Sequence, residues 1–82
     1  MSDIEKASDM GSEFLKKMLN VKDVKVIKVA KVGVSWEIEA EVYEESSFIK
    51  SLGLPTRVKD RNIYYVKLNE SFEAEFYKRK RQ

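Results

Sequence analysis

The chain contains no cysteine and no histidine among its 82 residues. Without cysteine there are no disulfides and no thiol nucleophiles, and without either residue type there are no zinc sites of the Cys/His kind. The absence of histidine also excludes the Ser–His and Cys–His pairs in which an imidazole activates a nucleophile. From the sequence we therefore predict no catalytic residue, no metal site, no cofactor and no enzymatic activity.

Long apolar runs are also missing. No run of about 18 apolar residues occurs, which is the length that a membrane-spanning helix needs, so we expect no membrane partner. Residues 1–6 lack the basic-then-apolar order of a secretory signal. We therefore expect a cytoplasmic protein.

The length and the charge of the chain limit its organisation. A chain of 82 residues is expected to form a single small domain (residues 1–82) with a modest core. The 16 basic and 14 acidic residues leave a formal charge of +2, which is too small to indicate a nucleic-acid partner by itself. The distribution of the charges along the chain is therefore more informative than their sum.

Residues 1–20 are predicted to form a helix. Apolar side chains recur along one stripe at helical spacing, at Ile4, Ala7, Phe14, Leu15 and Met18. Ser2 or Asp3 can cap its beginning, and Asn20 suits its end. Gly11 is expected to be its weak point, because glycine costs about 1 kcal/mol relative to alanine inside a helix.

Residues 21–45 are predicted to form a first β-hairpin. Its first half interleaves valine and isoleucine with lysine, and the alternation slips between Val26 and Ile27, which indicates a bulge. Gly33 permits the tight turn. The stretch from Val34 to Val42 then alternates strictly between the two faces of a strand, which is the strongest structural signal in the sequence.

The glutamates of this strand raise the question of a carboxylate site. Glu37, Glu39 and Glu41 share one face at a spacing of about 7 Å, roughly the separation that glycoside hydrolysis uses. A general acid needs burial to raise its pKa, however, and these carboxylates lie on the polar face opposite lysines. A flat strand also spreads its side chains, whereas a metal needs converging ligands. We interpret the row as a solvated sheet face.

Two apolar features each have two interpretations. Trp36 is expected to be a core residue whose indole N–H finds a carbonyl, with a stacking platform for a nucleic-acid base as the alternative. An apolar cluster near the middle of the chain is expected to plug the open end of the sheet, with a partner-binding patch as the alternative. This cluster consists of Phe48, Ile49, Leu52 and Leu54.

The remaining segments complete the fold class. Residues 46–61 are predicted to be a connection with a short helical turn that ends at Gly53, and residues 62–77 a second hairpin. The residues expected to share one face of its last strand are Phe72, Ala74 and Phe76. One helix and two local hairpins predict an α+β fold, in which the helix packs on a four-stranded antiparallel sheet.

The chain closes on a basic segment, residues 78–82, which is predicted to be a tail extended into water. The candidate partner-binding residues are Arg57, Lys59, Arg61, Tyr77, Lys78, Arg79, Lys80 and Arg81. A solubilising tail, a site for an acidic protein surface and a site for nucleic-acid phosphates are the three interpretations. No ribonucleoprotein pattern, phosphate-binding loop or helix-turn-helix spacing accompanies it.

Several segments of the second half occur in an order typical of a known family. They are a Trp-led alternating strand (Trp36–Val42), a loop with Pro55 and Asp60, the strand Tyr64–Leu68 and the basic close Tyr77–Arg81. Together they resemble the O-type gas vesicle accessory proteins over roughly residues 33–81. The turn Asn69–Ser71 lacks the aspartates and glycine usual in that family, and half of the basic close is lysine.

The resemblance implies a process and a set of partners. It implies a non-enzymatic accessory protein of gas vesicle assembly, located in the cytoplasm and at the gas vesicle. It further implies contacts with other gas vesicle proteins, including the AAA-class ATPase of the same gene clusters. The alternative, drawn from the residues alone, is a small nucleic-acid-binding module that uses the basic tail and exposed tyrosines.

Overall fold

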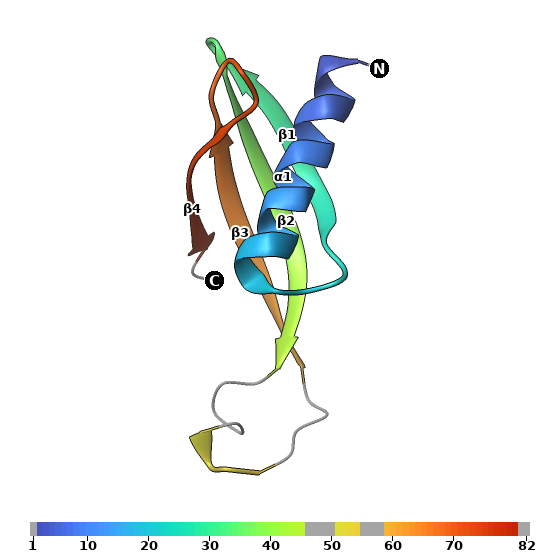
Figure 1. Cartoon of the computed structure of the whole chain (residues 1–82), viewed down its shortest axis with the longest axis vertical. Coiled ribbons are helices and arrows are strands. Elements are labelled where there is room, and N and C mark those ends of the chain that lie inside the picture. The colour runs from blue at the N-terminus through green and yellow to red at the C-terminus, as the bar shows by residue number, and fades with distance from the viewer. Residues whose placement is uncertain (1, 46–50, 55–58, 81–82) are drawn as a thin grey trace.

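A computed structural model of the chain describes residues 2–45, 51–54 and 59–80 and shows an α+β fold (Figure 1). Its elements are the helix α1 (Asp3–Leu19) and the strands β1 (Lys25–Val32), β2 (Ser35–Glu45), β3 (Lys59–Leu68) and β4 (Ala74–Lys80). The strands form one four-stranded antiparallel sheet in the order β1-β2-β3-β4. The predicted fold class is therefore confirmed. The helical turn predicted within residues 46–61 lies largely outside the described residues.

Helix α1 begins and ends at the capping residues that the sequence predicts. The Ser2 hydroxyl accepts a hydrogen bond from the N–H of Glu5 at 3.2 Å. At the other end Asn20 adopts the left-handed conformation (φ 54°), and its N–H bonds to the carbonyl of Lys16. Among the described residues no helix has the length and apolarity to span a membrane.

The helix buries a narrower stripe than its apolar pattern predicts. The buried residues of α1 are Ala7, Gly11 and Leu15. Ile4 and Met18 are 58% and 51% exposed, so the expectation that they share the core stripe is wrong. A straight helix contacts a twisted sheet most closely at its middle, and both residues lie two turns from Gly11.

Gly11 marks the closest approach of the helix to the sheet. A Cβ atom built on Gly11 would lie 2.6 Å from Cδ1 and 3.2 Å from Cγ2 of Ile38, a fully buried residue of β2. The position that the sequence presents as a weak point is therefore a packing requirement, because any side chain there would overlap the core.

Replacing Gly11 with alanine is expected to lower the free energy of unfolding by about 1 kcal/mol. Alanine gains about 1 kcal/mol of helix propensity, but overpacking against Ile38 costs roughly 1–3 kcal/mol. Urea denaturation measures the difference. In an Ile38→Val background, which lacks the Cδ1 methyl, the same substitution should be neutral or stabilising. Equal effects in the two backgrounds would contradict the close approach.

The first hairpin has the bulge and the turn that its sequence predicts. The register between β1 and β2 shifts between Val26 and Lys28, which leaves Ile27 as the extra residue. Gly33 has φ 63°, a conformation that the first central position of a tight hairpin turn requires and that glycine adopts without strain.

The inner face of the sheet, which faces α1, forms the core. Its buried strand residues are Trp36, Ile38, Ala40, Val42, Tyr64, Val66 and Leu68. The prediction that Trp36 is a core residue is confirmed, since it is 5% exposed and stacks on Phe72 at 6.0 Å between ring centroids. No described hydrogen bond involves its indole, and no buried side-chain N or O atom of the described chain lacks a partner. The carbonyl expected as partner of the indole N–H is therefore not found among the described residues.

Several boundaries differ from those predicted from the sequence, among them the start of the first hairpin, since β1 begins at Lys25 and not at residue 21. Strand β3 begins at Lys59, inside the predicted connection 46–61, because β2 is long enough to pair with it. Strand β4 continues to Lys80, inside the predicted tail 78–82, where Lys80 pairs with Ile63. Pairing with β3 and the alternation of side chains between two faces offset the repulsion between consecutive cations.

A second bulge, which the sequence pattern does not predict, lies in β4. Ala74 pairs with Leu68, and Phe76 pairs with Lys67. Glu75 is therefore the extra residue of the bulge. The bulge turns Phe76 to the outer face of the sheet and Tyr77 to the inner face. The Tyr77 ring there meets the Phe14 ring edge-on at 5.4 Å.

The bulge also overturns the predicted alternation of Phe72, Ala74 and Phe76. Phe72 lies in the turn before β4 with φ 64°, and Phe76 is 47% exposed on the outer face. The turn is held by Asn69, whose side-chain oxygen accepts hydrogen bonds from the N–H groups of Ser71 (2.8 Å) and Glu73 (3.0 Å).

Candidate functional site

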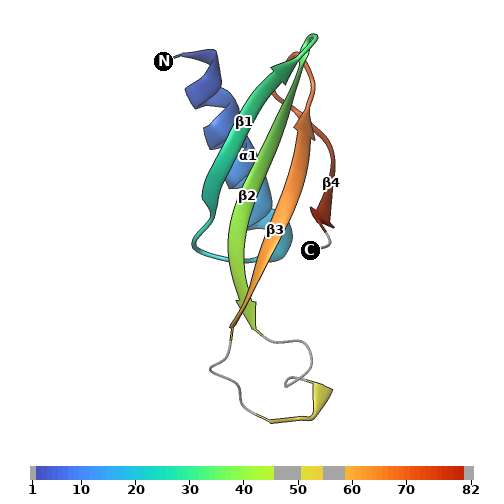
Figure 2. The same cartoon turned by 180° about the vertical axis from the view of Figure 1, so that it is seen from behind.

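The outer face of the sheet is the face that α1 does not cover, and none of the described segments lies over it (Figure 2). The strand register assigns side chains to it, because residues paired across neighbouring strands share a face. Its main residues are Lys25 and Lys28 (β1), Glu37, Glu39, Glu41 and Tyr43 (β2), Lys59, Arg61, Ile63, Tyr65 and Lys67 (β3), and Phe76, Lys78 and Lys80 (β4).

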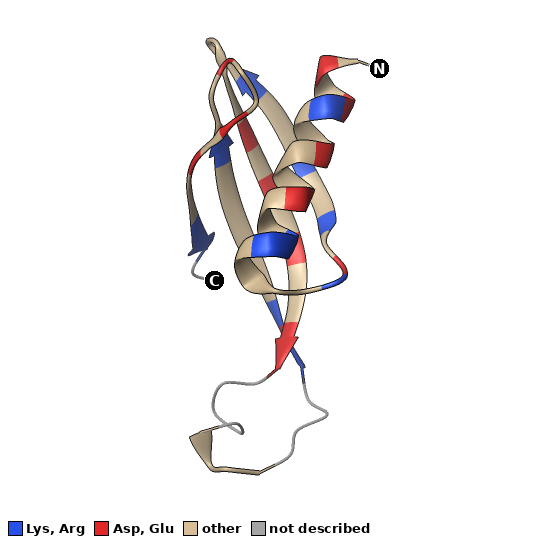
Figure 3. Ribbon diagram, viewed as in Figure 1, with Lys and Arg blue, Asp and Glu red and all other residues tan. Residues whose placement is uncertain are grey.

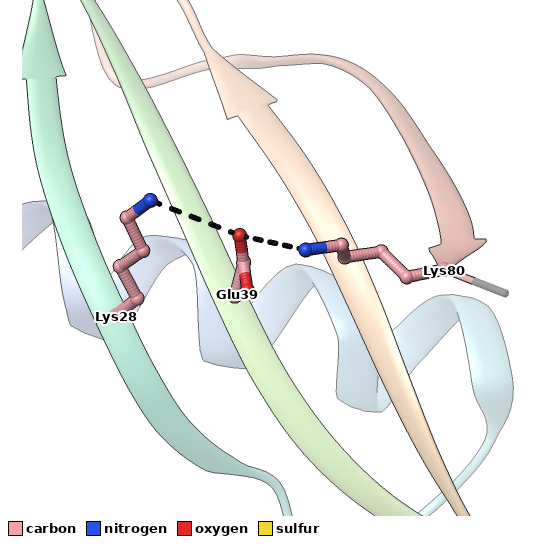
Figure 4. A network of polar contacts seen from close by, with 3 residues as sticks. All are labelled: Lys28, Glu39 and Lys80. Carbon is pink, nitrogen blue, oxygen red and sulfur yellow. Dashed lines mark hydrogen bonds and ion pairs between the residues drawn. The ribbon is translucent and has the colours of Figure 1, made fainter. Parts of the chain in front are cut away.

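Charged residues recur along the strands of the sheet (Figure 3), and the strand register places many of them in rows on the outer face. The glutamates of β2 form a central acidic row, with lysines of β1 on one side and cations of β3 and β4 on the other. Glu39 contacts Lys28 at 4.0 Å and Lys80 at 3.1 Å, so Lys80 reaches from β4 across β3 (Figure 4). Each contact contributes little at a solvated surface, but together they fix the register.

Glu41 has the shortest ion pair of the row. Its Oε2 atom accepts a hydrogen bond from Nε of Arg61 at 2.6 Å. This bond lowers the pKa of Glu41 below its usual value and outweighs the opposing effect of burial. Glu41 is therefore an ionised partner of Arg61. The side chains of Glu39 and Glu41 are only 20% and 12% exposed, so this part of the row is less solvated than the sequence interpretation expects.

An aromatic pair lies beside the cations on the β4 side of the outer face. The rings of Tyr65 and Phe76 are 5.5 Å apart, and Nζ of Lys78 lies 5.9 Å from the Tyr65 ring. Ile63, next to them, is only 9% exposed, and burial, followed by a hydrogen bond with Glu37, raises the pKa of Tyr65. This region thus combines an apolar centre with charges of both signs around it, glutamates on the β2 side and lysines on the β4 side.

The predicted partner-binding residues do not form one surface. Arg57 and Arg81 lie outside the described residues. Lys59, Arg61, Lys78 and Lys80 lie on the outer face, whereas Tyr77 and Arg79 lie on the inner face. Arg61 and Lys80 are engaged by glutamates, whereas no ion pair between described residues involves Lys59, Lys78 or Arg79.

Tyr65 and Phe76 are not among the candidate partner-binding residues predicted from the sequence, where the aromatic residues beside the basic segment are equally suited to a small core. The place of Phe76 depends on the bulge in β4, which the sequence pattern does not predict, whereas Tyr65 reaches the outer face through the regular register of β2 and β3. A usable signal was present in the two pairs of adjacent aromatic residues, Tyr64-Tyr65 and Phe76-Tyr77. Neighbouring residues of a strand point to opposite faces, so each pair places one ring on the outer face.

A polar cluster extends the inner face beyond the core. Oε1 of Glu44 accepts hydrogen bonds from the Tyr64 hydroxyl at 2.5 Å and from Nδ2 of Asn62 at 2.9 Å. Tyr64 is 8% exposed. Burial first, and the carboxylate of Glu44 second, raise the pKa of Tyr64 to about 12.

This pKa predicts a loss of stability in alkali. Tyr64 ionises near pH 10.0 in the unfolded chain and near pH 12 in the folded one. The stabilisation that Tyr64 provides is therefore complete below pH 10 and is lost as the pH rises to about 12. The free energy of unfolding should fall by at most about 3 kcal/mol over this range. Urea denaturation at pH 9, 10 and 11 measures it, with Tyr64→Phe as the control. If Tyr64→Phe loses as much stability over this range as the parent, Tyr64 is not the group responsible.

No family model, no curated protein and no solved structure matches this chain. The resemblance to the gas vesicle accessory proteins therefore rests on the quoted sequence segments alone.

Proposed function

We propose that this chain is a non-enzymatic protein-binding module whose partner docks on the outer face of the sheet around Phe76. The observation that supports it is the bulge at Glu75, which turns a half-exposed aromatic ring toward solvent on an uncovered face. Bulges commonly re-aim a side chain beside functional surfaces. Aromatic residues surrounded by polar and charged groups are also the usual energetic centre of protein interfaces.

The charge pattern favours a protein partner over nucleic acid. The row formed by Glu37, Glu39 and Glu41 runs along the strand next to the aromatic pair and would repel phosphates. A surface with rows of both signs suits a protein that carries complementary rows. The nucleic-acid alternative draws its support from Tyr65 and Phe76 beside Lys78, since bases stack on such rings.

The resemblance to the gas vesicle accessory proteins specifies a cellular process for the proposed binding module. It favours gas vesicle assembly in the cytoplasm, with other gas vesicle proteins and their AAA-class ATPase as the partners. Its support is the pattern of sequence segments, which fall largely on β2, β3 and β4, three neighbouring strands of the outer face.

The test is recovery of partners from a gas-vesicle-forming cell at low and high salt. We expect the parent chain to retain gas vesicle proteins through high salt, because an apolar contact responds weakly to ionic strength. Phe76→Ser should lose them. Met10→Ser is the matched control, since Met10 is 43% exposed on α1 and Phe76 is 47% exposed. The free energy of unfolding of both variants should lie within about 1 kcal/mol of that of the parent.

Other outcomes of this recovery contradict particular parts of the proposal. Full recovery by Phe76→Ser would remove the outer face as the docking surface. Recovery of nucleic acid at low salt alone would support the nucleic-acid module instead. Recovery of a different set of proteins that depends on Phe76 would keep the binding module and overturn the gas vesicle process.

A further inference from the structure

Strand β4 is one edge of the sheet, and none of the residues that the structure places pairs with its free side (Figure 1). In an antiparallel sheet every second residue of an edge strand directs its N–H and C=O groups outward. Such an edge can accept an extended segment as an additional strand. The bulge at Glu75 restricts the regular part of this edge to Phe76–Lys80.

The regular part of β4 carries positive charge on both of its faces. Lys78 and Lys80 point to the outer face and Arg79 to the inner face. Their neighbours on β3 are Tyr65, Ile63 and Tyr64, none of which is acidic. Lys80 binds Glu39, whereas no ion pair between described residues involves Lys78 or Arg79. A strand added at this edge would therefore meet cations without acidic partners on each face.

A second copy of the chain is a poor occupant of this edge. Two copies joined in antiparallel fashion through Phe76–Lys80 would place Lys78 opposite itself, with Arg79 and Lys80 close by on each chain. Like charges directly opposite each other destabilise a strand pair. The other edge, β1, also carries lysines (Lys25, Lys28 and Lys31) and a bulge. Lysine-rich edges resist pairing between copies, but the same charges attract an acidic strand.

We propose that β4 binds an acidic extended segment of a partner protein by antiparallel strand addition along Phe76–Lys80. This inference rests on the proposed protein-binding function and specifies the partner segment. Antiparallel pairing continues the arrangement of the whole sheet. It sets acidic residues opposite Lys80, Arg79 and Lys78, followed by apolar residues opposite Tyr77 and Phe76. The segment that fits therefore reads, from its amino end, three acidic residues and then two apolar ones.

The order of charges provides a test with a matched control. The probe is the capped peptide Ser-Glu-Glu-Glu-Val-Val-Ser, and the control is the reversed sequence Ser-Val-Val-Glu-Glu-Glu-Ser, which has the same composition and charge. Titration of the ¹⁵N-labelled full chain should shift the amide signals of residues 76–80 and slow their hydrogen exchange. We expect the probe to bind at least about tenfold more tightly than the control.

Variants locate the contact on β4. Lys78→Glu and Arg79→Glu should each weaken the binding of the probe by about tenfold or more. Lys17→Glu, which makes the same change at an exposed position of α1, should bind as the parent does. Circular dichroism of each variant verifies that it is folded.

Three results would overturn strand addition. The first is equal affinity for the probe and the reversed peptide, which would show attraction by charge alone. The second is equally tight binding of an oligothymidylate to the same amides, which would show a phosphate site. The third is self-association through β4 in sedimentation equilibrium.

The experiment separates this inference from the proposed function. Loss of cellular partners by Phe76→Ser without peptide binding would keep the outer-face docking and overturn strand addition. Ordered peptide binding without recovery of gas vesicle proteins would keep strand addition and overturn the proposed process.

Discussion

Replacing Trp36 with alanine is expected to lower the free energy of unfolding by about 3–5 kcal/mol, a large part of the stability of so small a domain. Trp36 is 5% exposed and pairs with Leu68 at the end of the β2–β3 ladder. Its ring stacks on Phe72 at 6.0 Å, and Nζ of Lys31 lies 5.7 Å from its centroid. Its removal leaves a cavity and deprives the turn before β4 of its packing partner.

Urea denaturation followed by far-ultraviolet circular dichroism measures this effect, because the chain has a single tryptophan and the variant loses that fluorescence signal. Trp36→Phe is the control. It preserves an aromatic ring against Phe72 and should cost less than half as much. Unfolding of Trp36→Ala at the midpoint of the parent would show that this end of the β2–β3 ladder is not part of the core.

The strictly alternating stretch predicted β2 correctly for a physical reason. Strand side chains have a period of two, so a register slip by one residue would expose every buried residue from Trp36 to Val42. The same logic located the bulge of β1, since the alternation itself slips between Val26 and Ile27. A strand with one buried face therefore shows an alternation of apolar and polar residues in its sequence wherever every residue of the buried face is apolar.

The bulge of β4 does not appear as a slip in the alternation of the sequence. Phe72, Ala74 and Phe76 alternate with glutamates as a regular strand would, yet the turn held by Asn69 and the pairing with β3 insert Glu75 as an extra residue. Those constraints come from contacts distant in sequence, which a local pattern does not contain. The face of Phe76 was therefore not predictable from alternation, whereas the alternation of β3 places Tyr65 on the outer face.

The basic close shows the same limit for charged residues. Consecutive cations repel one another, which predicted a tail in water for residues 78–82. Pairing with Ile63, Tyr64 and Tyr65 of β3 instead extends β4 to Lys80. The role of the candidate residues in partner binding stays a prediction, and the division of those on β4 between an outer and an inner face follows from the strand.

Replacing Leu15 with alanine is expected to lower the free energy of unfolding by about 2–5 kcal/mol, whereas Met18→Ala should change it by less than about 1 kcal/mol. Leu15 is fully buried and Met18 is 51% exposed, although both belong to the apolar stripe of the sequence. Leucine, methionine and alanine have similar helix propensities, so the comparison isolates burial.

Urea denaturation of the two variants decides how α1 is rotated on the sheet. Equal losses would mean that Met18 is as buried as Leu15, which would turn the helix away from the line of Ala7, Gly11 and Leu15. If only Leu15→Ala shows a large loss of unfolding free energy, the line of Ala7, Gly11 and Leu15 lies over Ile38. That result would also tie α1 to the inner face, and that arrangement is what leaves Phe76 and the end of β4 open to a partner.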